Sequence, residues 1–140
     1  MENSDFFKIG NVDSLPPFFM NIVSAGNLWT FVSSNGGITA GRRSAEFALF
    51  PYYTDDKITD LAETTGSKTI IRLSGSRKCW EPFSVRSEAS FRLERNLYKS
   101  CWGNSIAFEE TNLDWNLRWS WKWSSSERFG FVREASLENT

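Results

Sequence analysis

One stretch near the end of the chain constrains the fold more than any other. In residues 113–124 every odd position from 113 to 123 is Leu or Trp, and every even position is polar. A period of two is typical of a half-buried β-strand, whereas a helix would spread these tryptophans around its axis. Burying one large apolar side chain is worth roughly 1.5–3 kcal/mol, so this face needs a second apolar layer. The pattern therefore predicts an antiparallel β domain, with a second sheet or with the sheet closed on itself.

The same alternation predicts which side chains of this strand are covered. We expect a central or near-central strand whose apolar face is mostly buried, comprising Trp115, Leu117, Trp119 and Trp121. We expect the polar set on the opposite face, comprising Asp114, Asn116, Arg118 and Lys122. Truncating Trp119 to alanine should then cost on the order of 3–5 kcal/mol, as large-to-small core substitutions do.

Shorter stretches upstream and downstream also predict strands. Residues 28–34 are rich in aromatic and β-branched side chains, Asn35-Gly36-Gly37 suits a tight hairpin turn, and 38–42 would form the return strand. Residues 68–73 read as a further strand and 79–85 as an edge segment, since Pro82 is tolerated there. The turn at 103–105 and the polar run at 124–128 predict a meander of neighbouring antiparallel strands in the last third.

Composition narrows the classes of function. The chain has 140 residues, which suit one domain over residues 1–140, and it contains no histidine. The commonest general base and the usual zinc ligand are therefore missing, and we expect neither a metal site nor a cofactor. Sixteen basic and seventeen acidic residues give a formal net charge of −1, which argues against nucleic acid as a partner. Cys79 and Cys101 are expected to be free, buried thiols.

The N-terminus lacks the pattern of a secretory signal peptide, and no run of 18 apolar residues spans a membrane. We therefore expect a cytoplasmic protein with no membrane partner. The strand-like pattern still runs at residues 137–140, which suggests that the sequence continues in a longer chain.

Polar side chains that could contact a ligand or another domain gather in residues 36–57. A glycine turn, planar arginines, tyrosines and aspartates occur there together on expected loops, and the candidates are Arg42, Arg43, Tyr52, Asp55 and Asp56. A self-contained ion-pair network is the plainer interpretation of the same residues. Asp55 and Asp56 are adjacent and would point apart in a strand, so they receive no catalytic role as a carboxylate pair.

Most of the chain resembles a known family. The resemblance lies in Leu15-Pro-Pro-Phe-Phe-Met-Asn-Ile-Val-Ser24, in residues 29–42 and in 48–58, which include Ala-Leu-Phe-Pro-Tyr-Tyr-Thr-Asp-Asp-Lys-Ile. It continues in Leu97-Tyr-Lys-Ser, Trp102-Gly-Asn, Phe108-Glu-Glu, Trp123-Ser-Ser-Ser-Glu-Arg-Phe-Gly-Phe-Val-Arg133 and Leu137-Glu-Asn139. These stretches are similar to the N-terminal region of large bacterial proteins related to cellobiose phosphorylase.

The resemblance implies an all-β fold, an antiparallel, galactose-mutarotase-like super-sandwich that is incomplete within these residues. It also implies a non-catalytic segment that packs on, or lends loops to, a downstream (α/α)6 catalytic barrel of a glycoside phosphorylase or hydrolase. Its partners would be a carbohydrate and that barrel, and the resemblance allows a homodimer of the full-length protein. The alternative is a free-standing carbohydrate-binding sandwich, in which some tryptophans stack on sugar rings.

Overall fold

The computed structural model describes residues 5–50 and 54–140. Its elements in chain order are β1 (Phe6–Gly10), η1 (Val12–Ser14), β2 (Phe19–Asn21), β3 (Leu28–Ser33), β4 (Ile38–Arg42), η2 (Ala45–Phe47), α1 (Asp55–Asp60), α2 (Val85–Glu88), β5 (Leu93–Ser100), β6 (Ser105–Asn112), β7 (Leu117–Ser126) and β8 (Gly130–Asn139). Here η marks a single turn of 3-10 helix.

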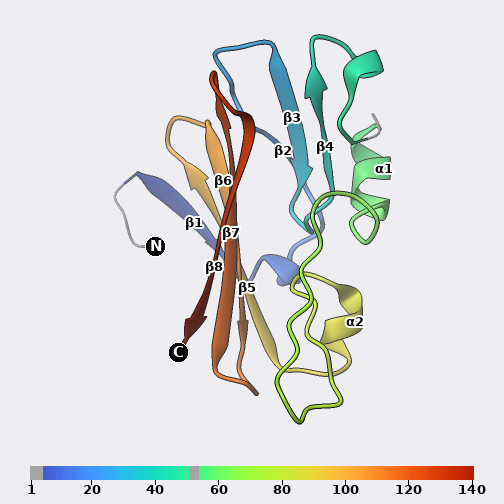
Figure 1. Ribbon diagram of the computed structural model, residues 1–140, viewed down its shortest axis with the longest axis vertical. Coiled ribbons are helices and arrows are strands. Elements are labelled where there is room, and N and C mark those ends of the chain that lie inside the picture. The colour runs from blue at the N-terminus through green and yellow to red at the C-terminus, as the bar shows by residue number, and fades with distance from the viewer. Residues whose placement is uncertain (1–4, 51–53) are drawn as a thin grey trace.

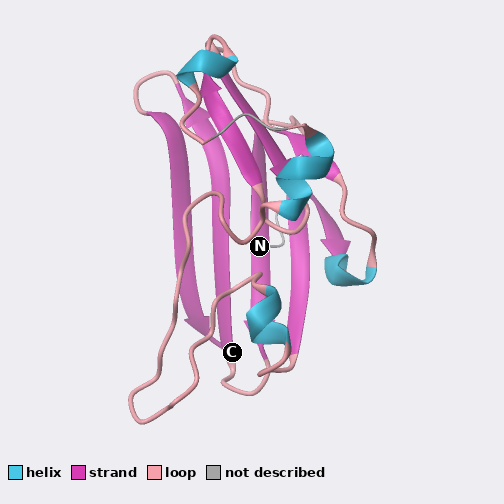
Figure 2. Ribbon diagram, turned by 90° about the vertical axis from the view of Figure 1, so that its right-hand side faces the viewer, coloured by secondary structure: helices cyan, strands magenta, loops and turns pink. Residues whose placement is uncertain are grey.

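The strands form two sheets that face each other (Figure 1). One sheet has the strand order β1-β5-β6-β7-β8 and the other has the order β2-β3-β4, with antiparallel pairing throughout. The predicted all-β antiparallel sandwich is thus confirmed, as is the meander of β5 to β8. Figure 2 looks onto α1, α2 and the long loop between them, which lie in front of the strands. In the described part of the chain, no helix has the length and apolar character that crossing a membrane requires.

The predicted hairpin of β3 and β4 is present and depends on glycine. Gly36 has a φ of +95°, which side chains other than glycine rarely adopt. A Cβ on Gly37 would lie 2.2 Å from the carbonyl oxygen of Ile58 in α1, and one on Gly41 would lie 2.3 Å from the ring of Trp29. The two glycines therefore allow α1 and the Trp29 ring to pack directly on the backbone of this hairpin.

The tryptophan-rich strand starts later than its alternation predicts. β7 begins at Leu117, and residues 113–116 form the hairpin turn after β6. The side-chain oxygen of Asn112 accepts hydrogen bonds from the backbone N–H groups of Asp114 and Trp115, both at 3.1 Å. Asn116 completes the turn with a φ of +53°. These local bonds compete with strand pairing, so the prediction was wrong for these four residues.

The register of β7 is as predicted. Trp121 and Trp123 are each 9% exposed and face the other sheet, whereas Trp119 is half-buried beside them. Arg118 and Lys122 lie on the opposite face, in ion pairs with Glu138 and Glu134 respectively. β7 is second from the edge of its sheet, which fits the near-central position expected. Trp115 and Leu117 are half-buried, less than the alternation predicts.

Residues 61–92 cover the part of the large sheet that the small sheet does not reach (Figure 1). The strand predicted at 68–73 is wrong, because this stretch makes only one bridge, between Ile71 and Trp80. Residues 79–85 share that bridge and lead into α2. The segment is instead anchored by side chains, and the Phe83 ring meets those of Phe108 and Trp121 edge-on, with centroids 5.3 and 5.1 Å apart.

The prediction for the two cysteines is half correct. Cys79 and Cys101 are free thiols, as predicted, but both are exposed rather than buried. They lie in connecting segments, Cys79 in the irregular stretch before α2 and Cys101 in the turn between β5 and β6. The general tendency of free cysteines to be buried does not hold here, because connecting segments lie on the surface.

Candidate functional site

A buried ion pair links the large sheet to α2. Arg95 on β5 and Glu110 on β6 are register partners, and both are buried. The Arg95 Nε lies 2.5 Å from Oε2 of Glu110, whose side chain is 0% exposed. Arg95 also donates to Glu88 of α2 and to the carbonyl oxygen of Ser84. This arrangement holds α2 and its flanking residues against the sheet.

Every oxygen of the Glu110 carboxylate is occupied. Oε1 accepts from the indole N–H of Trp80 at 2.5 Å, and Oε2 accepts from the backbone N–H of Phe83 at 2.8 Å as well as from Arg95. Burial opposes the charge of Arg95, but the attraction of Glu110 and the hydrogen bonds to Glu110 and Glu88 outweigh it and raise the pKa of Arg95. The pair is a structural anchor rather than a reactive group.

A cleft of about 450 Å³ opens next to this anchor. It lies between η1, α1 and α2, which Figure 1 shows on the same side of the large sheet. Its polar lining includes the four carboxylates of Asp13, Asp60, Glu63 and Glu88. The other polar residues of the lining include Arg95, Ser34, Asn35 and Thr59. Its apolar lining includes Leu15, Pro17 and Phe83. This is the candidate functional site, and we call it the acidic cleft.

The four carboxylates of the acidic cleft differ in how firmly they are held. Glu88 is paired with Arg95, and Glu63 binds the start of α2. The Glu63 oxygens accept from the backbone N–H of Val85 at 2.9 Å and from the Ser84 hydroxyl at 3.0 Å. Asp13 and Asp60 are exposed at the rim. The rim carboxylates are thus the ones that are free to accept hydrogen bonds from a ligand.

The pKa of Glu63 lies below its usual value of 4.5. Partial burial acts against the charged form, but the hydrogen bonds from Val85 and Ser84 and the attraction of Lys68 and Arg86 outweigh it. Glu63 is therefore ionised at neutral pH and is a poor proton donor.

This shift predicts a pH-dependent contribution of Glu63 to stability. Because its pKa is lower in the folded state, its contribution is complete above the unfolded pKa and is lost as the pH falls through the folded pKa. The difference in unfolding free energy between wild type and Glu63→Gln should be largest near neutral pH and should shrink below pH 4.5. Urea unfolding at a series of pH values measures it, with exposed Glu94→Gln as control. A difference that does not vary with pH would contradict the assignment.

The five contact residues predicted from the sequence are not among the described residues that line the acidic cleft. Two of them have described side chains, and three do not. Arg42 and Arg43 are exposed at the end of β4, and Arg43 has a φ of +58°. Arg42 lines a separate cavity of about 230 Å³ together with residues 24–28 and 125–127. Asp55 and Asp56 begin α1, but their side chains, like Tyr52 as a whole, lie outside the described residues. Whether these five residues share a contact stays a prediction.

Sequence reasoning missed the acidic cleft because its residues come from five separate segments. None of Asp13, Asp60, Glu63 and Glu88 stands in a recognisable motif. The anchor beside the cleft does leave a signal in the sequence. Glu110 shares the strand face of Ile106 and Phe108, and a carboxylate on an apolar face requires a buried partner.

Among the described side chains, which leave out those of Asp55 and Asp56, no three Cys, Asp or Glu residues come together closely enough to hold a metal ion.

No protein-family model matches the chain. No curated protein matches it either.

Proposed function

We propose that the chain is a non-catalytic, carbohydrate-binding β-sandwich that serves a glycoside phosphorylase or hydrolase, and that the sugar binds in the acidic cleft. The observation that carries this proposal is the lining of the cleft, where carboxylates and an amide stand beside an apolar wall. The resemblance to the N-terminal region of cellobiose-phosphorylase-like proteins supports the same class of ligand.

The chemistry of the acidic cleft suits a sugar. A volume of about 450 Å³ falls in the range of small-molecule sites, roughly 300–1,000 Å³. Sugar hydroxyls donate hydrogen bonds that Asp13 and Asp60 can accept, and Asn35 and Ser34 offer further polar groups. Leu15 and Pro17 provide an apolar wall for the C–H faces of a sugar ring. Among the described lining residues the guanidinium is that of Arg95, which is already paired with two carboxylates.

The two anchored carboxylates of the cleft, Glu63 and Glu88, are unsuited to acid catalysis. Glycoside hydrolysis requires one carboxyl group whose raised pKa keeps it protonated as a general acid. Glu63 has a lowered pKa, and Glu88 is bound to the Arg95 guanidinium. The absence of histidine removes the other common acid. Turnover is therefore assigned to a catalytic domain outside these residues, the downstream barrel that the resemblance implies.

The open edge of the large sheet favours a contact with such a domain. β8 is an edge strand of ten residues, and its residues from 134 onward are exposed. A long uncovered edge is a template for strand addition or for packing against another element. In the alternative, a free-standing carbohydrate-binding module, the edge would have to remain open in solution. A reading frame of many hundred further residues distinguishes the first case from the second.

Isothermal titration calorimetry tests the proposal. The purified chain is titrated with cello-, malto- and xylo-oligosaccharides. We expect saturable binding of at least one series. Asp60→Asn should weaken it about tenfold, the effect of roughly 1.4 kcal/mol, which is the order of one lost hydrogen bond to a charged group. Glu94→Gln, an exposed carboxylate on β5 outside the cleft, is the matched control and should bind as wild type does.

Two outcomes would overturn the proposal. The carbohydrate assignment fails if no series binds saturably, or if Asp60→Asn and Asp13→Asn both bind like wild type. The non-catalytic assignment fails if the same preparation hydrolyses or phosphorolyses the sugar that it binds.

A further inference from the structure

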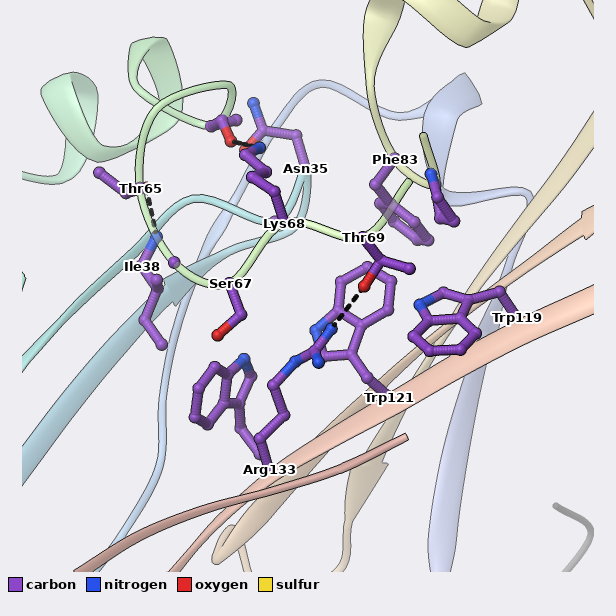
Figure 3. A pocket seen from close by; sticks show the side chains of 15 residues that line it. Asn35, Ile38, Thr65, Ser67, Lys68, Thr69, Phe83, Trp119, Trp121 and Arg133 are labelled. Atoms are coloured by element: carbon purple, nitrogen blue, oxygen red, sulfur yellow. Dashed lines mark hydrogen bonds between the residues drawn. The ribbon is translucent and has the colours of Figure 1, made fainter. Parts of the chain in front are cut away.

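A second cavity lies between the large sheet and the long loop, separated from the acidic cleft by a shared wall. It is small, about 30 Å³, and its lining includes Trp119, Trp121, Trp123 and Arg133 from the large sheet. The long loop contributes Ser67, Lys68 and Thr69 to the opposite side. Asn35, Ala62 and Phe83 line both cavities and form the wall between them. We call this space the tryptophan cavity (Figure 3).

The polar groups of the tryptophan cavity can donate hydrogen bonds, and its described lining residues include no carboxylate. The indole Nε1 of Trp119 and the Nε of Arg133 are both buried without a hydrogen-bond partner in the described structure. Thr69 and Ser67 contribute hydroxyl groups. Lys68 adds a positive charge on the loop side, where its ammonium group binds the carbonyl oxygen of Ala62.

Arg133 is the unusual member of this set. Figure 3 shows its side chain reaching from β8 across the ring of Trp121 to Thr69, to which it donates a long hydrogen bond of 3.4 Å. No carboxylate among the described residues pairs with Arg133, whereas the other partly or fully buried arginines, Arg95 and Arg118, both have carboxylate partners. Burial alone lowers the pKa of Arg133, which agrees with a positive charge that lacks a counter-charge.

A buried or half-buried charge is costly unless it is paired, and two donors left without acceptors add to that cost. A water molecule could accept hydrogen bonds here but would not neutralise the guanidinium. A small anion would do both, and a planar carboxylate matches the fork geometry of arginine. The volume restricts the ligand to a group of a few atoms.

We infer that the tryptophan cavity binds the carboxylate group of a small organic acid, held by Arg133 and the indole N–H of Trp119. This inference goes beyond the binding of neutral sugar in the acidic cleft and does not depend on it. The carboxylate could belong to a free small acid or to an acidic sugar, because both present the same group.

Tryptophan fluorescence of the purified chain provides the readout, since Trp119 and Trp121 line the cavity. Wild type is titrated at neutral pH and constant ionic strength with sodium formate, acetate and glucuronate, with sulfate as a larger anion. We expect a saturable change with at least one carboxylate in the millimolar range and none with sulfate. Saturation by formate or acetate but not glucuronate identifies a free acid, and tighter binding of glucuronate than of acetate identifies an acidic sugar.

Matched variants separate the site from general effects of salt. Arg133→Gln should weaken carboxylate binding at least tenfold, whereas Arg72→Gln, which removes an exposed arginine from the long loop, should leave it unchanged. Thr69→Val removes the hydroxyl that holds the guanidinium and should also weaken binding, which provides a second test if Arg133→Gln does not fold. Asp60→Asn should bind carboxylate as wild type does, so failure here is distinguishable from failure of the sugar site.

The inference is overturned if no carboxylate gives a saturable change in the wild type. It is also overturned if Arg133→Gln and Thr69→Val both show the same saturable change as the wild type. The same holds if sulfate produces the same change as acetate.

Discussion

Replacing Glu110 by alanine is expected to lower the free energy of unfolding by about 3–5 kcal/mol, the usual cost of removing one partner from a buried ion pair. The substitution would leave the Arg95 guanidinium charged inside the sandwich. It would also remove the acceptor for the indole N–H of Trp80 and for the backbone N–H of Phe83. Urea unfolding followed by circular dichroism measures the change.

Two comparisons make this result interpretable. Glu134→Ala breaks the exposed pair with Lys122 on β7 and should cost far less, because water already solvates both charges. The double variant Arg95→Met with Glu110→Leu removes both charges and should recover much of the stability lost in Glu110→Ala. A Glu110→Ala protein as stable as the Glu134→Ala protein would contradict the anchor.

Trp121→Ala is expected to lower the free energy of unfolding by about 3–5 kcal/mol, as other aromatic-to-alanine changes in a core do. The Trp121 ring stacks on Phe108 with centroids 4.7 Å apart and an interplanar angle of 5°. It also meets Phe83 from the covering segment. Its removal would therefore open a cavity between the large sheet and residues 61–92. Urea unfolding again provides the measurement.

The burial of each tryptophan predicts how much stability its replacement by alanine costs. Trp119 is half-buried, so Trp119→Ala should cost less than Trp121→Ala, and less than its alternation alone suggests. Trp102 is 77% exposed, and Trp102→Ala is the matched control with little expected loss. A larger loss for Trp119→Ala than for Trp121→Ala would mean that the core is centred elsewhere.

The regular part of the fold could be predicted because it depends on short-range patterns. Alternation located β7, and aromatic and β-branched content located β3. The turn at Asn35-Gly36-Gly37 located the hairpin that returns through β4. The start of β7 could not be predicted from alternation, because the Asn112 side chain bonds the next backbone N–H groups and turns the chain. Local polar side chains decide such boundaries, and hydrophobic periodicity does not record them.

The segment of residues 61–92 and both cavities could not be predicted for a different reason. Their residues are held by contacts far apart in sequence, such as that between Trp80 and Glu110. A composition rich in short polar residues gives no period there, and a short run such as 68–73 has the residue types of a strand without forming one. The residues that line the acidic cleft come from segments far apart in sequence, so they are neighbours only in the folded structure.

The spacing of the two glycines around β4 has a consequence for evolution. Position 37 faces the Ile58 carbonyl and position 41 faces the indole of Trp29. Neither glycine can be replaced by a larger residue while α1 and the Trp29 ring pack on the hairpin. Ancestral and present-day relatives that retain this packing should share glycines four positions apart, Gly-Ile-Thr-Ala-Gly here, even where the rest of the sequence has diverged beyond recognition. Such a short, sterically enforced signature can trace lineage after overall similarity has been lost.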